Sequence, residues 1–148
     1  MTFPRSGKLL GIDHGIKRIG LATCDGLQMI ARELTIITRT SKVEDFAKLN
    51  TFAAEHKVVG IVIGMPYDVD APPGVYIQAD TVKLWTERFG TTTILPIRFW
   101  DEQMTSEDAK QLARQHKRKP DAPLDDLAAR IILQNYLDAL RDGLTDLE

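Results

Sequence analysis

The sequence predicts an α/β domain with a mixed five-stranded sheet and helices packed on both faces. Two observations lead to this fold class. Three strand-like runs follow one another in the first third of the 148-residue chain, and helical and strand-like segments then alternate to its end. Hydrophobic residues make up 43% and charged residues 27% of the chain, which are values of an ordinary globular domain. We therefore expect a single domain over residues 1–148, without repeats or a linker.

The first two strands are expected to form a β-hairpin around which the other elements are arranged. A short apolar run of Leu9, Leu10 and Ile12 ends at Asp13, a turn containing Gly15 follows, and residues 18–23 alternate between apolar and other side chains. Asp13 then stands at a strand end. There it is either a turn residue that caps its own backbone or a metal ligand or catalytic acid, and the hairpin alone leaves both interpretations open.

The later elements are predicted from apolar spacing and from helix-start signals. Ser41 and Glu44 form a capping box that starts a helix. The continuous apolar run that follows this helix is typical of a parallel strand covered on both faces. The expected bounds are 28–37 for a third strand, 41–56 for a helix, 58–64 for a strand, 75–89 for a helix, 94–100 for a strand, 105 for the start of a helix, and 125–141 for the last helix.

Composition limits the setting and the partners. The single cysteine, Cys24, excludes a disulfide framework within one chain, and no apolar run approaches the roughly 18 residues of a membrane span. We expect a cytoplasmic protein without a membrane partner. The formal net charge of −2 argues mildly against nucleic acid. There is nevertheless a local basic patch, which consists of Arg114, Lys117, Arg118 and Lys119. This patch is either a solvated helix end or a mobile segment that binds phosphate.

Acidic residues from three distant segments are predicted to meet at one edge of the sheet. Asp13 and the pair Asp101 and Glu102 follow strands, and Asp125 opens the last helix. Ligand sites of open α/β sheets lie beyond the carboxyl ends of parallel strands. Carboxylates packed together repel unless a cation lies between them, and oxygen ligands suit Mg²⁺ or Mn²⁺. Two such ions would support phosphodiester hydrolysis, although each acid taken alone is also explained as a turn or first-turn residue.

Four motifs in order over nearly the whole chain, GIDHGIKRIGLA, VVGIVIGMPYDVD, WDEQMTS and DDLAARIILQNYLD, resemble those of the YqgF family, also called RuvX or Holliday-junction-resolvase-like. The resemblance implies an RNase H-like fold and a metal-dependent nuclease that processes pre-16S rRNA. It also implies the site residues. The catalytic, metal-binding acids would be Asp13, Glu102 and Asp125, with Asp101 as a secondary acid, and nucleic acid would contact Lys17, Arg18 and Thr105 besides the basic patch.

Two departures from the family pattern bear on activity. Gln103 stands where the family has arginine, which removes a charge that would hold phosphate or orient the acids. The loop after Pro66 carries Asp68 and Asp70 where the family usually has an asparagine-containing segment, which adds negative charge near a polyanion. Activity, substrate preference or both are expected to differ from the family norm.

Three other functions are compatible with the sequence. Cleavage of Holliday junctions in DNA would use the same acids and would need a homodimer. A non-catalytic nucleic-acid-binding module of the same fold is suggested only by Gln103. An actin-like or sugar-kinase ATPase shares the order of Asp13, Gly15 and Lys17, but such proteins enclose nucleotide between two lobes and 148 residues supply one.

Overall fold

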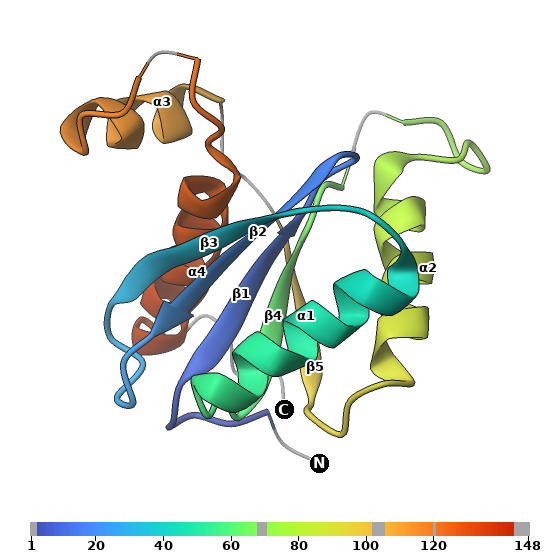
Figure 1. Cartoon of the computed structure of the whole chain (residues 1–148), viewed down its shortest axis with the longest axis horizontal. Helices are drawn as coiled ribbons and strands as arrows, with labels where there is room; N and C mark the ends of the chain where they lie inside the picture. The colour runs from blue at the N-terminus through green and yellow to red at the C-terminus, as the bar shows by residue number, and fades with distance from the viewer. Residues whose placement is uncertain (1–2, 68–70, 102–105, 120, 144–148) are drawn as a thin grey trace.

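The computed structural model describes residues 3–67, 71–101, 106–119 and 121–143, except for the side chains of residues 106–110. One five-stranded sheet has the strand order β3-β2-β1-β4-β5 (Figure 1). β1 pairs antiparallel with β2, and β2 with β3, whereas β1, β4 and β5 run parallel. The predicted mixed sheet is confirmed. Its strands are β1 Leu9–His14, β2 Arg18–Cys24, β3 Ala31–Thr38, β4 Gly60–Met65 and β5 Ile97–Asp101.

Helices cover both faces of this sheet, as expected. α1 (Lys42–Glu55) and α2 (Gln78–Gly90) pack on one face, and α4 (Asp125–Arg141) packs on the other (Figure 1). α3 (Ser106–Gln115) packs on α4 beyond the sheet. In the part of the chain that the structure describes, no helix is both long and apolar enough to cross a membrane.

Side chains of β1 alternate between two hydrophobic clusters, one under each helical layer. Leu10 and Ile12 belong to the cluster beneath α1 and α2, and Leu9 belongs to the cluster beneath α4. This alternation is the ordinary consequence of the pleat. It assigns the two residues at the end of the strand to opposite faces: Asp13 lies on the α4 face and His14 on the α1/α2 face.

Local polar contacts explain where several elements begin. The Ser41 hydroxyl accepts a hydrogen bond from Glu44 N at 3.2 Å, which confirms the predicted cap of α1. α2 begins at Gln78 rather than near residue 75, because Asp80 accepts a hydrogen bond from Ile77 N. β5 begins at Ile97 rather than residue 94, since Ile94 is 97% exposed and outside the sheet. β3 starts at residue 31 after a turn in which the Asp25 carboxylate accepts three backbone N–H bonds.

Candidate active site

Asp13 lies at the carboxyl end of the central strand, on the face that α4 covers. It is the penultimate residue of β1, is half-buried, and pairs with Gly20 of β2. Residues directly opposite each other in an antiparallel pair point to the same face, with Cα atoms about 4.5–5.5 Å apart. Gly11, two residues earlier, faces Leu133 of α4. Asp13 and the bare backbone of Gly20 therefore lie side by side beneath the start of this helix.

The first turn of α4 rests directly on Gly20. A Cβ atom at this position would lie 1.8 Å from the carbonyl oxygen of Asp125 and 2.9 Å from the amide nitrogen of Asp126. No side chain fits such a gap, so the close approach of the helix to β2 requires glycine. Because Gly20 is the partner of Asp13 in the sheet, the contact brings Asp13 and Asp125 to one corner of the molecule.

Arg18, the first residue of β2, holds the Asp125 carboxylate. Its Nε donates to Asp125 Oδ2 at 2.7 Å, and the two side chains are 42% and 24% exposed. Asp125 is also the first residue of α4, where the helix dipole favours a negative charge. The pair thus holds the Asp125 carboxylate at the site while much of the Arg18 side chain stays open to solvent and to a phosphate group.

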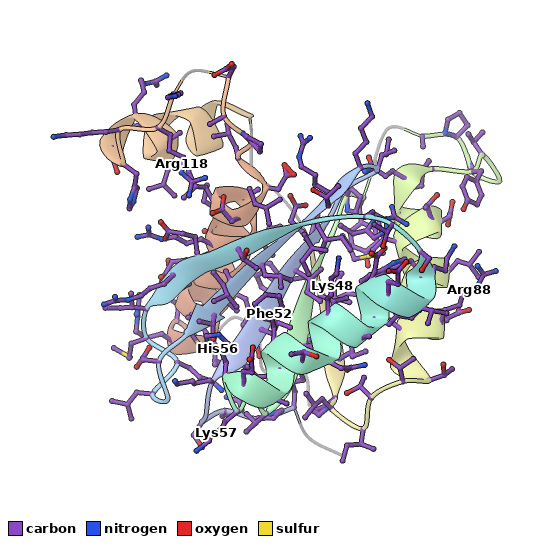
Figure 2. All side chains as sticks on the ribbon, in the orientation of Figure 1. Lys48, Phe52, His56, Lys57, Arg88 and Arg118 are labelled. Carbon is purple, nitrogen blue, oxygen red and sulfur yellow. The ribbon has the colours of Figure 1, made fainter. Side chains whose placement is uncertain are left out.

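Asp126 has a different partner on the other side of the helix start. Arg118 donates from Nη1 and Nη2 to the two Asp126 oxygens at 2.7 and 2.8 Å, and Figure 2 shows Arg118 beside the beginning of α4. The hydrogen bond with Asp126 raises the pKa of Arg118. Arg118 therefore anchors the segment that precedes α4, and its contact with nucleic acid stays a prediction.

The structure brings together only part of the predicted acid set. Asp101 is the parallel-strand partner of Met65, whose side chain belongs to the cluster beneath α1 and α2. The register therefore places Asp101 on the face opposite Asp13. Glu102 and Thr105 lie outside the described residues. Within the described residues no three His, Cys, Asp or Glu side chains group closely enough to hold a metal ion. Of the predicted acids that the structure describes, Asp13 and Asp125 lie at this corner and carry oxygen atoms of the kind that Mg²⁺ and Mn²⁺ prefer.

The predicted basic residues divide between two places. Lys17 is exposed on the turn between β1 and β2, next to Arg18. Arg114, Lys117 and Lys119 are exposed at the end of α3 and just after it. Lys117 has a positive φ of 55°, a conformation that is common just beyond the end of a helix. These positions are compatible with phosphate contacts, which remain predictions.

Arg39 is a residue that sequence analysis missed. Its Nη1 donates to the carbonyl oxygens of Gly15 and Ile16 at 2.9 and 3.2 Å, and its backbone N–H bonds to Lys17 O at 3.0 Å. Arg39 therefore fixes the turn that carries Lys17 and leads into Arg18. An isolated arginine after a predicted strand gives no sign of such a role, because its partners lie more than twenty residues earlier in the chain.

His14 is the second residue that was missed. It is 7% exposed, and its ring centroid lies 4.7 Å from that of Trp85 of α2. Burial, together with the positive charges of Arg39 and Lys42, lowers the pKa of His14 to about 4. The imidazole is therefore neutral at pH 7. In the sequence, only the position of His14 next to Asp13 pointed to a functional role for this residue.

A family model described as "RuvX: Holliday junction resolvase" matches residues 7–139. The chain belongs to this family. It is 37% identical over 143 residues to a protein of Cereibacter sphaeroides and 41% identical over 138 residues to one of Crocosphaera subtropica, both named "Putative pre-16S rRNA nuclease". The alignments cover 94% and 91% of this chain and 88% and 95% of the relatives. RuvX proteins are a nuclease family, which assigns the chain to the phosphodiester hydrolases.

Solved structures share the fold. Thermus thermophilus RuvC aligns with a TM-score of 0.59 at 13% identity, over 93% of this chain and 97% of that one. The fowlpox virus resolvase in its Holliday junction complex aligns with a TM-score of 0.53 at 10% identity, over 90% and 98% of the two chains. At such identities the likeness shows the fold alone, and it confirms the RNase H-like prediction. Resolvases and nucleases with this fold generally use divalent metal ions and bind nucleic acid.

Proposed function

We propose that this RuvX protein is a single-domain, cytoplasmic, metal-dependent endonuclease that processes the 5′ end of pre-16S rRNA. The observation that carries the proposal is the meeting of Asp13 and Asp125 at one corner, enforced by the contact of α4 with Gly20. The two relatives at 37% and 41% identity are named "Putative pre-16S rRNA nuclease", and these names support the choice of RNA. Asp13, Glu102 and Asp125 are the proposed ligands of Mg²⁺ or Mn²⁺.

The chain contributes binding, orientation and charge to this reaction. Asp13 and Asp125 offer carboxylate oxygens, and Arg18 binds the Asp125 carboxylate through a partly exposed hydrogen bond that a metal ion can replace. When bound, divalent ions supply an activated water and stabilise the charge on the leaving oxygen. The Arg18 side chain is 42% exposed next to Asp125, so its guanidinium is accessible to a scissile phosphate bound at the acids, and guanidinium groups bind phosphate oxygens strongly. Lys17 on the neighbouring turn adds a second positive charge.

A second candidate substrate is the Holliday junction. The family description names junction resolvases, and the same acids would cut a DNA strand. Symmetric cleavage of a four-way junction needs two active sites, so this function would require a homodimer. RNA cleavage needs one site, and the oligomeric state in the presence of each substrate therefore separates the two candidates.

The decisive experiment offers the purified protein a panel of labelled precursor rRNA 5′ ends, four-way DNA junctions and single strands, with Mg²⁺ or Mn²⁺. We expect metal-dependent cleavage of the rRNA precursor. Cleavage of junctions alone would transfer the assignment to DNA. Specific binding of rRNA without cleavage at any metal concentration would contradict the catalytic proposal and favour a binding module, for which the missing arginine at Gln103 would be the reason.

Asp13→Asn tests the central ligand. The substitution keeps the shape of the side chain and removes one negative charge from an acidic corner, so the free energy of unfolding should hold or rise. Turnover should fall by roughly a hundredfold or more, since a metal ion contributes several kcal/mol to transition-state stabilisation. Asp142→Asn, at the exposed far end of α4, is the matched control and should cleave normally. An unfolded Asp13→Asn protein with intact residual specific activity would make Asp13 a structural turn residue.

A further inference from the structure

Two adjoining hollows lie on the face of the sheet opposite the acid corner. The larger, about 570 Å³, is an open groove formed by the β1–β2 turn, the segment after β3 and the start of α1. The smaller, about 100 Å³, lies between the end of β1, the start of α1 and α2. Arg39 and Lys42 line both hollows. We call these two hollows together the basic cleft.

Positive charge dominates the basic cleft. The larger hollow includes Lys17 and the smaller one includes Arg88, which Figure 2 shows on α2 beside the start of α1. The carboxylate in the lining is that of Asp45, which is 2% exposed, accepts a hydrogen bond from Thr40 N at 3.1 Å and lies 3.9 Å from Arg39 Nε. With Arg39 and Lys42, the lining carries four cations against one carboxylate. The amino-terminal end of α1, which begins at Lys42, adds the positive end of its dipole.

His14 supplies an independent sign that a ligand binds here. Its side chain lines the smaller hollow, and its Nε2 is buried without a hydrogen-bond partner among the described residues. Buried polar atoms in folded proteins are nearly always paired. An imidazole N–H donates readily to a phosphate oxygen. A phosphate in the hollow would satisfy this nitrogen and bring an anion next to Lys42 and Arg88.

We propose that the basic cleft is a phosphate-binding site, and that it takes a backbone phosphate of the same nucleic acid that is cut at the acid corner. The choice of nucleic acid rests on the proposed function. Asp13 and His14 are consecutive residues that emerge on opposite faces of the sheet, so the acid corner and the basic cleft flank the same edge. A strand passing over this edge reaches both, with one phosphate at the acids and a neighbouring phosphate in the cleft.

The double substitution Lys42→Ala with Arg88→Ala tests the cleft. Its matched control is Lys48→Ala with Lys83→Ala, which removes the same charge from exposed positions on the same two helices that do not line the cleft. Figure 2 shows Lys48 on α1. Affinity for a labelled rRNA precursor is measured by fluorescence anisotropy over a salt series, with EDTA present. We expect the cleft variant to lower the slope of log affinity against log salt by about 0.7–0.9 for each lost contact, and affinity near 0.1 M salt by roughly tenfold or more.

The slope of log affinity against log salt should fall less than half as far in the control as it falls in the cleft variant. Equal slopes and affinities for the two double variants would overturn the proposal, because the cleft would then act only as general surface charge. Both sets of substituted side chains are exposed, so melting temperatures are expected to match the wild type and to exclude unfolding as the cause of lost binding.

Inorganic phosphate distinguishes the source of the bound group. If the cleft takes free phosphate, this ion should raise the melting temperature of the wild type and of the Lys48→Ala, Lys83→Ala control but not of the cleft variant. A phosphate response of this kind with unchanged rRNA affinity would confirm a phosphate site and reject the nucleic-acid backbone as its ligand. A cleft variant that matches the control in both assays would reject the site altogether.

The binding assay contains no metal and is therefore independent of cleavage. If the protein cuts none of the substrates while the cleft variant still binds rRNA more weakly than its control, the proposed function is wrong and the phosphate site in the cleft is supported. If cleavage is found and the two variants bind alike, the inference about the cleft alone is wrong.

Discussion

The first turn of α4 contains two adjacent aspartates, each paired with an arginine, and the two pairs are built differently. Asp125 receives one hydrogen bond, at 2.7 Å, from an Arg18 side chain that is 42% exposed. Asp126 receives two, at 2.7 and 2.8 Å, from Arg118, and these side chains are 10% and 23% exposed. The first pair lies beside Asp13 and the second ties down the segment before the helix.

This difference separates a pair that is able to exchange partners from one that is not. An exposed ion pair contributes little to stability, so Arg18 can release Asp125 to a metal ion or turn toward a phosphate at small cost. Removing one partner of a buried bidentate pair leaves an uncompensated charge, which costs several kcal/mol. We therefore propose separate roles for these neighbouring acids, with Asp125 in the site and Asp126 holding the segment before α4.

The largest effect is expected from exchanging the two carboxylates for amides one at a time. Asp125→Asn should lower the rate of rRNA cleavage by roughly a hundredfold or more, because it removes a charged metal ligand. Asp126→Asn should change the specific activity of the folded protein only a few-fold. Single-turnover cleavage with equal amounts of folded protein measures both. If Asp126→Asn folds normally and loses cleavage, the assignment of Asp125 rather than Asp126 to the site is wrong.

Stability should show the opposite order. Arg118→Ala leaves the buried Asp126 carboxylate without its partner and should lower the free energy of unfolding by about 2–3 kcal/mol, somewhat below the range for a fully buried pair because Arg118 is partly exposed. Urea denaturation provides the measurement. Lys119→Ala, at an exposed position one residue away, is the control and should stay within about 0.5 kcal/mol of the wild type. Equal losses would mean that Arg118 is ordinary surface charge.

Acid sensitivity is expected to arise outside both pairs, at His14. Its pKa is about 4 in the folded protein against 6.5 as the ordinary value, so between these pH values the unfolded chain binds more protons and stability falls as pH falls. From about pH 7.5 to about pH 5 the loss should approach 2 kcal/mol. Urea denaturation in EDTA, comparing wild type with His14→Phe, measures it. A pH dependence that persists unchanged in His14→Phe would place the sensitivity elsewhere.

The smallest effect on stability is expected for Arg18→Ala. Loss of an exposed pair should cost no more than about 1 kcal/mol. The freed Asp125 carboxylate should bind Mn²⁺ several-fold more tightly, since a positive charge near a cation site weakens binding. Isothermal titration with Mn²⁺ measures this change. Weaker Mn²⁺ binding by the variant would show that Arg18 builds the metal site instead of competing with it, and the two arginines would then be alike.

The fold was accessible from sequence because its signals are local. The burial of all six β4 residues matches the continuous apolar run, and the cap at Ser41 and the start of α4 at Asp125 were placed correctly. Element ends set by side chains acting on the backbone were misplaced, as at Asp80 and Asp25. These shifts depend on which carboxylate oxygen reaches which N–H, and hydrophobic spacing contains no such information.

The site was accessible only in part, for a related reason. Asp13 and Asp125 were identifiable because they stand at element ends and match family motifs. The position of His14 against Trp85 and the bonds of Arg39 to the β1–β2 turn depend on contacts between segments that are distant in the chain. Arg118 lies only eight residues before Asp126, but their pairing depends on the path of the segment between them, which apolar spacing does not specify. The face to which Asp101 points depends on strand register, which one residue reverses. Pattern analysis of a single chain specifies neither distant contacts nor register.

The contact of α4 with Gly20 also determines when the acid corner can form during synthesis of the chain. Arg18 and Asp125 are 107 residues apart, and Gly20 meets the same distant turn. A nascent chain that has made all five strands still lacks Asp125, and α4 must then be complete to cover the apolar residues Leu9 and Val62 on its face of the sheet. A chain truncated before Asp125 therefore carries Asp13 without its companion acid and cannot form the acid corner.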